Sequence, residues 1–342
     1  MPSITEDDIY RASTQYRLWS YTQASLASLR ATTNAGAAEG VRAAIKSQAS
    51  NDGRQATAVQ YLKRFYLSNS PMTYHPKEMM PSALFLATKT ENNYISAEKF
   101  AEKLPKTTAE DLIAPEFILT QGLRFTFDVR HPLRGLEGGL IELLALANGT
   151  GQPGSGSTAT AAKLQNDMMT IGLKAKKGEA SRSTDELVYY IKKSADNAKD
   201  ILKTSALLSD AYLLYSPSQI WLSSLFLADE PLARFYIDTK FPTPSSMKPK
   251  LLITLEACVQ LLRKSPSAKP GEEEMKELMR IDKKLYKCRN PEKIDLLGIN
   301  RAQKREGGEE GLDDKVAKKR KLEREKSEKE AEDVFGPPLG LK

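Results

Sequence analysis

One apolar pattern occurs twice in this chain, 141 positions apart. Tyr-x-Pro, five further residues and then Ser-x-Leu-Phe-Leu-Ala describe both Tyr74–Ala87 and Tyr215–Ala228 without a gap. The interval is far above the roughly 20 to 50 residues of solenoid repeats, so the pattern predicts two copies of a domain rather than a repeat array. The alternative is a chance likeness between two Leu- and Ala-rich helices.

The length and composition agree with two domains of an intracellular type. The chain has 342 residues, enough for two domains and tails. Its two cysteines, Cys258 and Cys288, are too few for a disulfide scaffold and favour a reducing compartment. The N-terminus is polar and acidic, and no apolar run reaches the roughly 18 residues of a membrane span. Neither a secretory signal nor a membrane association is therefore expected.

The positive charge of the chain is modest and spread out. The net charge is +7, and the region from residue 301 holds 12 Lys and Arg against 11 Asp and Glu, which leaves +6 for the rest. Such a charge balance permits an acidic partner but does not by itself indicate nucleic-acid binding.

Hydrophobic periodicity predicts helices almost throughout, and the alternation typical of strands is nearly absent. The predicted fold class is all-α, with two five-helix bundles in tandem and flanking N- and C-terminal helices. Proline and serine signals mark several helix starts, notably before residues 76 and 217. The predicted helices are 5–30, 54–67, 76–89, one from 96, 108–125, 132–147, 184–206, 210–215, 217–229, 230–239, 247–264 and 271–288.

Composition shifts divide the chain into segments. From residue 32 to 52 the chain is rich in Ala, Gly and Ser with weak periodicity, which indicates a linker or a marginal helix. Residues 148–183 are rich in Gly, Ser, Thr and Lys, which indicates a mobile insert that is mostly loop. The predicted segments are an N-terminal helix at 1–31, a linker or degenerate helix at 32–53, a first bundle at 54–130, a second bundle at 131–266 with the insert, a C-terminal helix at 267–299 and a charged disordered tail at 300–342.

Signals of catalysis are weak. Gly149-x-Gly151-x-x-Gly154 matches a dinucleotide-binding fingerprint, but a Leu/Ala helix precedes it where a strand is needed. The two histidines, His75 and His131, each precede a proline and have no zinc-ligand spacing with the cysteines. We therefore predict no catalytic residue, no metal and no cofactor, and an enzyme is the less favoured class.

Several segments of the chain match motifs of one known family, namely Tyr10–Trp19, Tyr61–Leu67, Tyr74–Pro76, Phe85–Lys89, Glu116–Leu119, Leu123–Phe125 and Asp210–Ile220. They resemble cyclins of the H type, within the cyclin C/H-like group, and Tyr10–Trp19 is similar to the extra helix of the fungal forms. The resemblance covers about residues 5 to 290, weakly at 31–53 and 148–183. It implies two cyclin boxes of five helices each, in agreement with the internal repeat. Because 40–53 holds few apolar residues, the first helix of box one is expected to be short or missing.

This resemblance implies a regulatory subunit without catalysis of its own. Such a cyclin binds and activates the cyclin-dependent kinase of the CDK-activating type in TFIIH, together with a MAT1-type assembly subunit. The kinase phosphorylates the C-terminal repeats of RNA polymerase II, and the implied location is nuclear. The alternatives are a TFIIB-like double-cyclin-fold transcription factor and a non-activating helical scaffold. A TFIIB-like factor would call for a zinc ribbon and a strongly basic face, so no sequence-specific nucleic acid is expected as a partner.

The resemblance also implies which residues bind the kinase. Lys89 and Glu116 would bond backbone groups of the kinase beside its mobile regulatory helix, and Leu86, Phe125 and Phe127 would receive that helix. Considered locally, Lys89 is a cation at a helix C-terminus and Glu116 an anion at a helix N-terminus, which needs no partner. Taken alone, the two phenylalanines are more typical of a core, and the resemblance makes the core and the kinase-binding interpretations equally favoured.

A basic run lies in the charged tail. Lys318, Lys319, Arg320 and Lys321 match a nuclear-import signal, and a solvated charged helix is the alternative because glutamates follow.

Overall fold

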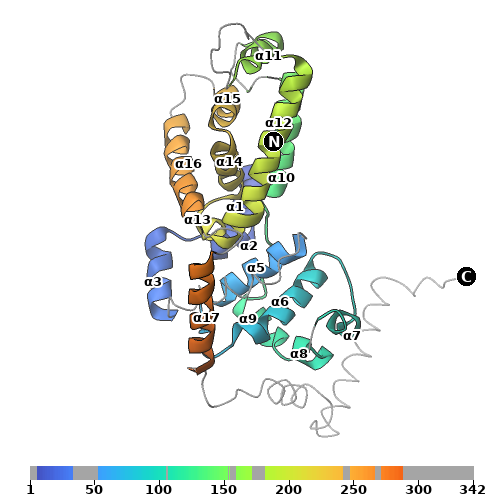
Figure 1. Ribbon diagram of the computed structural model, residues 1–342, viewed down its shortest axis with the longest axis vertical. Helices are drawn as coiled ribbons and strands as arrows, with labels where there is room; N and C mark the ends of the chain where they lie inside the picture. Colours follow the sequence, from blue (N-terminus) through green and yellow to red (C-terminus); the bar gives the residue numbers. More distant parts are fainter. Residues whose placement is uncertain are drawn as a thin grey trace, which may run out of the picture. The chain divides into compact units, whose positions relative to one another are not determined.

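The computed structural model describes residues 6–33, 53–104, 107–152, 154, 159–171, 182–241, 247–265 and 271–287. The chain divides into two units, 1–291 and 292–342, and every described residue belongs to the first. The regular elements of the described ranges are all helical, as predicted (Figure 1).

The first bundle surrounds one apolar helix, α6 (Pro76–Thr90). Its neighbours are α5 (Gly53–Phe65), α7 (Ala97–Ala101), α8 (Ala109–Ile113) and α9 (Glu116–Gly122) (Figure 1). The side chains of α6 are buried on nearly every side, which is why it lies at the centre. The buried core is formed by Ala58, Tyr61, Leu62, Phe65, Tyr66, Met79, Met80, Ala83, Leu86, Ala87, Leu119 and Leu123.

Local signals fix both ends of α6. The His75 imidazole accepts a hydrogen bond from the backbone N–H two residues further on, and Pro76 occupies the first turn, where its missing N–H costs nothing. Beyond the C-terminus, Asn92 adopts φ +56°, a conformation that asparagine tolerates. In the middle of the helix, the fully buried Ser82 hydroxyl donates to the Leu112 carbonyl of α8 at 2.7 Å.

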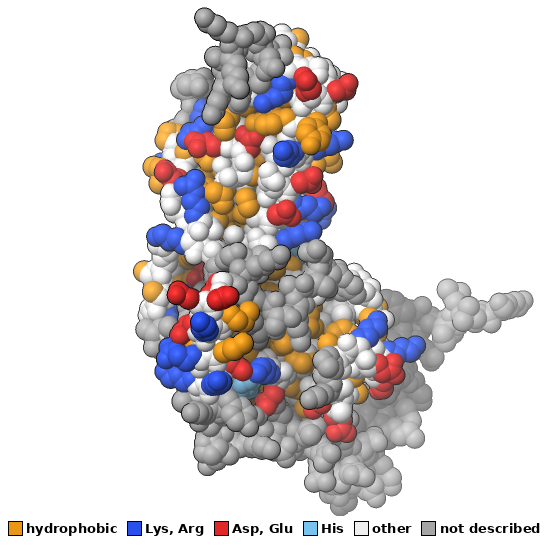
Figure 2. All heavy atoms as spheres, viewed as in Figure 1, with side chains coloured by type: hydrophobic (Ala, Val, Ile, Leu, Met, Phe, Trp, Pro, Cys, Tyr) orange, Lys and Arg blue, Asp and Glu red, His pale blue; other side chains and the backbone are white. Residues whose placement is uncertain are grey.

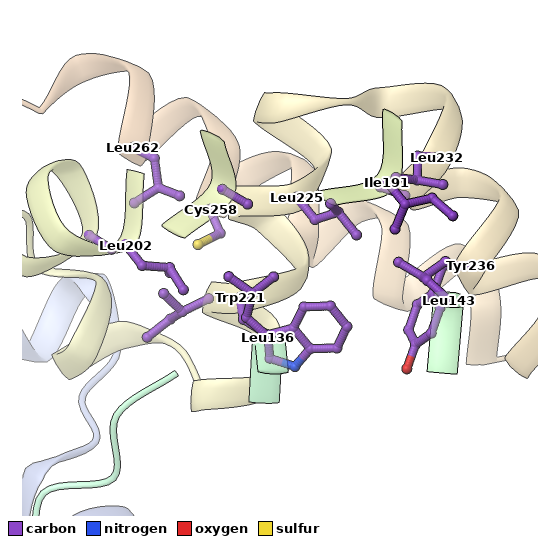
Figure 3. Close-up of a cluster of buried hydrophobic side chains, with 14 of the residues drawn as sticks. Leu136, Leu143, Ile191, Leu202, Trp221, Leu225, Leu232, Tyr236, Cys258 and Leu262 are labelled. Carbon is purple, nitrogen blue, oxygen red and sulfur yellow. The ribbon is translucent and has the colours of Figure 1, made fainter. Parts of the chain in front are cut away.

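The second bundle surrounds α14 (Pro217–Ala228), which carries the second copy of the sequence pattern. Figure 3 shows its core, in which side chains from several helices point toward one another around Trp221. Burial in this core raises the pKa of the Cys258 thiol to about 11, so the thiol stays protonated. The second bundle as a whole consists of α10 (Leu133–Ala147), α11 (Ala161–Met169), α12 (Thr184–Ile201), the π-helical turn η1 (Leu202–Ala206), α13 (Ala211–Leu214), α14, α15 (Glu230–Lys240) and α16 (Met247–Lys264).

Two glycines of α10 make room for the Trp221 ring. A Cβ at Gly135 would lie 2.5 Å from the indole, and one at Gly139 would lie 2.6 Å from it. Gly138, on the same helix, faces open space. The close approach of α10 to α14 therefore requires glycine at the first two positions.

The predicted N-terminal helix over 5–30 is wrong as a single element. The structure has α1 (Glu6–Ala12), α2 (Thr14–Trp19) and α3 (Gln23–Thr33). Ser13 is extended and its hydroxyl caps α2, and Ser20 is extended as well. Serine side chains compete for backbone hydrogen bonds, which ends a helix where packing favours a turn.

Other differences concern prolines and the insert. The predicted helix 108–125 is two helices, because Pro115 lies between α8 and α9 and has no N–H to continue the first. The insert predicted to be mostly loop contains α11, whose Leu164 and Met168 are buried in the second core. The predictions for 34–52, for most of the insert outside α11 and for the tail lie outside the described residues. The C-terminal helix α17 spans Glu272–Lys287, close to prediction.

Polar contacts join the two bundles. The Lys63 ammonium of α5 donates to the carbonyls of Leu207 and Ser209, at 2.6 and 2.5 Å. These carbonyls follow η1, where a helix C-terminus favours a cation. Arg30 of α3 forms two parallel bonds of 2.6 Å to the Asp210 carboxylate, ahead of α13. The N-terminal helices thus contact the second bundle directly.

His131 lies at the same junction. Its Nε2 is 2.8 Å from the Thr57 hydroxyl of α5, and its Nδ1 is 3.2 Å from the Tyr212 hydroxyl of α13. Thr57 donates its one proton to Glu91, so Nε2 carries the imidazole proton and Nδ1 accepts from Tyr212. Burial lowers the pKa of His131, since it disfavours the charged ring.

Candidate functional site

Lys89 and Glu116, 27 positions apart in the sequence, form an ion pair. Lys89 lies in the last turn of α6 and Glu116 is the first residue of α9, and Nζ is 2.6 Å from Oε1. Each charge also suits the helix end that carries it, so the local interpretation of both residues holds as well. The side chains are 38% and 18% exposed, so the pair lies at the surface.

The aromatic ring of Phe85 also contacts Lys89. The Lys89 Nζ lies 4.3 Å from the ring centroid, one helical turn back along α6, which is a cation–π contact. Phe85 itself is buried against α7 and α8. Phe85 was not among the residues predicted to bind the kinase, although its i,i+4 spacing to Lys89 places both on one face of the helix. An ammonium has three N–H donors, and the half-exposed position leaves room for a partner's carbonyl.

The three predicted apolar residues differ in exposure. Leu86 is 5% exposed and belongs to the first core, so it offers little surface. Phe127 packs on that core edge-to-face with Tyr61, at 6.3 Å between ring centroids, and its carbonyl accepts from the Tyr61 hydroxyl. Phe125 is 62% exposed. Phe125 is thus the most exposed apolar side chain of the predicted set.

The turn that carries Phe125 has an unusual backbone. Phe125 N–H donates to the Thr120 carbonyl and Arg124 N–H to the Gln121 carbonyl, the two bonds of a Schellman motif at the end of α9. The left-handed position of that motif usually holds glycine, and here it holds Arg124 at φ +52°. Phe125 follows at φ +54°. Two consecutive non-glycine residues in this region cost free energy that other contacts must offset.

The remaining candidates give no further site among the described residues. Lys318, Lys319, Arg320 and Lys321 lie outside those residues. Within the described ranges, no three His, Cys, Asp or Glu side chains gather as metal ligands would. None of the helices that the structure describes combines the length and apolar character of a bilayer span. On the face shown in Figure 2, basic and acidic side chains are mixed rather than separated.

The second bundle matches a known family. The family model of the cyclin C-terminal domain covers residues 131–263, from two residues before α10 to one residue before the end of α16. Two tandem bundles, each around a central helix of the same pattern, define a cyclin-fold protein.

Curated relatives of this chain are cyclins, and some of them carry the name cyclin-H. Cyclin CCL1 of Saccharomyces cerevisiae is 28% identical over 284 residues, covering 70% of this chain and 63% of the relative. Cyclin mcs2 of Schizosaccharomyces pombe is 27% identical over 324 residues, covering 83% of this chain and 86% of the relative. The chain thus spans a little under two thirds of the budding-yeast relative and most of the fission-yeast one.

Solved structures agree with these relatives. A chain of the CAK complex from Chaetomium thermophilum, solved with ATP-γ-S bound, is 30% identical with a TM-score of 0.69, over 90% of this chain and 98% of that one. A chain of the yeast TFIIK (Kin28/Ccl1/Tfb3) complex is 28% identical with a TM-score of 0.56, over 74% and 100%. The chain belongs to the cyclin family, as a member of the cyclin H type.

Proposed function

We propose that this chain is the regulatory subunit that binds and activates the cyclin-dependent kinase of the CDK-activating type within TFIIH. Its chemistry is binding, and the kinase performs catalysis. Through that kinase the chain supports phosphorylation of the RNA polymerase II C-terminal repeats, in the nucleus, and a MAT1-type subunit is its third partner. The relatives in CAK and TFIIK assemblies support this assignment.

The observation that carries the proposal is the Lys89–Glu116 pair. Two helix ends bring a half-exposed ammonium and a carboxylate to 2.6 Å of each other at the surface. Together they offer donors and acceptors to the backbone of a partner, and charge-assisted bonds of this kind fix register. Phe125 supplies an exposed aromatic anchor, the type of residue that dominates affinity in interfaces. Leu86 and Phe127 support this surface from the core below it.

Activation follows from differential binding. A kinase whose regulatory helix moves between two positions shifts toward the one that the cyclin binds better. In the favoured position, the glutamate of that helix pairs with the lysine that holds the ATP phosphates. The cyclin therefore needs no catalytic group of its own.

The test is reconstitution with a purified catalytic subunit of CDK-activating type. The full chain is expected to stimulate phosphorylation of a polymerase repeat peptide, and Lys89→Ala/Glu116→Ala to reduce kinase affinity at least tenfold. Loss of two charge-assisted bonds accounts for that size. A folded wild-type chain that neither binds nor stimulates the kinase would contradict the proposal.

A charge exchange separates binding from fold stability. In Lys89→Glu/Glu116→Lys the ion pair can re-form within the chain, while each charge then meets the wrong kinase backbone group. We expect weak kinase binding together with a modest loss of thermal stability, because each exchanged charge opposes the helix end that carries it and the cation–π contact with Phe85 is lost. Arg234→Glu/Glu230→Arg, which exchanges the exposed pair of α15, serves as the matched control with unchanged kinase binding. If Lys89→Glu/Glu116→Lys binds the kinase as tightly as the wild type does, the ion pair acts only within the cyclin.

A further inference from the structure

The strained turn after α9 is held from outside its own bundle. The indole N–H of Trp19, in α2, donates to the Thr126 hydroxyl at 2.9 Å. The same hydroxyl donates to the Leu123 carbonyl at 2.7 Å, so it connects α2 to the last residues of α9. The hydroxyl thus donates its one proton and accepts at one of its two lone pairs.

A cation–π contact adds to this hydrogen bond. The Arg124 guanidinium lies 5.5 Å from the Trp19 ring centroid, and Arg124 is the residue with the left-handed backbone. Arg64 of α5 contacts the same ring at 5.1 Å and donates to the Asp128 carbonyl at 3.0 Å. Burial lowers the pKa of Arg64 to about 10, well above neutral pH, so the guanidinium stays charged.

The chain beyond the turn is tied to α2 as well. The Gln15 side-chain carbonyl accepts from the Arg130 backbone N–H at 2.5 Å. Gln15 and Trp19 are both buried and lie one turn apart on α2. The segment from Arg124 to Arg130 is therefore held by one face of a helix that is far away in sequence.

A strained turn persists only where its surroundings determine it, and such turns occur where a side chain must be presented in one position. We propose that Trp19 is a positioning residue for kinase binding, acting through Thr126 and Arg124 to keep Phe125 exposed on the left-handed turn. This rests on the proposed function, with Phe125 as the group that touches the kinase. Without Trp19 the turn relaxes toward ordinary backbone, and the Phe125 ring leaves its docking position.

The experiment measures kinase affinity of full-length variants. Thr126→Val keeps the shape of the side chain and removes both hydrogen bonds, and we expect affinity to fall roughly three- to tenfold. Thr126→Ser, which keeps the hydroxyl, is expected to bind like the wild type. Thr254→Val is the matched control, because the Thr254 hydroxyl bonds only a carbonyl of its own helix on α16.

A positioning role differs from a general structural one in a double-mutant comparison. Phe125→Ala alone is expected to weaken binding, and adding Thr126→Val or Trp19→Phe to it should cause no further loss. Amide exchange at Phe125 should also rise in Thr126→Val, whose overall unfolding midpoint stays close to that of the wild type.

Three results would overturn the inference. They are wild-type affinity in both Thr126→Val and Trp19→Phe, a loss that adds fully to that of Phe125→Ala, or an equal loss in Thr126→Ser. Each would leave kinase binding by the wild-type chain intact, so the proposed function would survive. A wild-type chain without kinase affinity would remove both.

Discussion

The central helices of the two bundles, α6 and α14, share a sequence pattern and a way of packing. Each begins with a proline after a capping side chain, His75 in one and Ser216 in the other. In each, the serine of the pattern is fully buried and donates to a carbonyl of a neighbouring helix, at 2.7 Å for Ser82 and 3.3 Å for Ser223. The shared pattern thus specifies how a helix is buried on all sides, including where its polar group bonds.

The two helices differ at their C-termini. α6 continues to Thr90 and carries Lys89 in its last turn, whereas α14 ends at Ala228. Asp229 then caps α15, and the position that matches Lys89 is Glu230, in an exposed ion pair with an arginine of its own helix. A common core is therefore compatible with different surface chemistry, and the first bundle carries both the Lys89–Glu116 pair and the exposed Phe125.

Each bundle has a glycine beneath a large aromatic ring, which allows one bundle to be destabilised at a time. A Cβ at Gly122 would lie 2.4 Å from the Phe65 ring, and one at Gly139 2.6 Å from the Trp221 ring. Both rings are buried and cannot move away freely. We expect Gly122→Ala and Gly139→Ala each to lower the free energy of unfolding by about 1–3 kcal/mol, through overpacking.

Urea unfolding and amide exchange, followed helix by helix, test this expectation. Gly122→Ala should raise exchange mainly in α5, α6 and α9, and Gly139→Ala mainly in α10 and α14. Gly138→Ala is the control for helix propensity, because it faces open space and should stabilise by up to about 1 kcal/mol. Equal stabilisation by Gly138→Ala and Gly139→Ala would show that the Trp221 indole leaves room for a Cβ at position 139 of α10.

The buried serines of the shared pattern test whether it contributes equally to the stability of both bundles. Ser82→Ala and Ser223→Ala each remove a buried hydroxyl that bonds a neighbouring helix, so we expect losses of about 1 kcal/mol in the free energy of unfolding. The Ser82 bond is 2.7 Å long and the Ser223 bond 3.3 Å, so the first loss should be larger. Chemical denaturation of the two variants gives the comparison, and a larger loss in Ser223→Ala would contradict it.

The smallest effect concerns His131, between the bundles. Burial lowers its pKa in the folded state below the unfolded value of about 6.5, so the unfolded chain takes up the proton first on acidification. The free energy of unfolding should therefore fall as the pH drops from about 7 through 6.5, by at most about 1.4 kcal/mol per pH unit. In His131→Gln the free energy of unfolding should fall less steeply with falling pH than in the wild type. The measurement compares the free energies of unfolding of the two proteins from pH 7.5 to 5.5. The same pH dependence in both proteins would contradict the expectation.

The sequence by itself determined the helical class, the duplication and most helix positions. These depend on hydrophobic spacing and on caps such as Ser216 with Pro217, which act over a few neighbouring residues. Glu116 and Lys89 were found through resemblance, since charges at helix ends are common and alone point to no partner.

Tertiary structure decided what distant residues do together. It placed the Lys89 ammonium against Glu116 and Phe85, and it separated exposed Phe125 from buried Leu86. It also ended the first helix at Ser13 and brought Trp19 to Thr126, 107 positions away. Such contacts depend on which elements pack against one another, and the free energy of that packing outweighs the local preferences that a sequence displays.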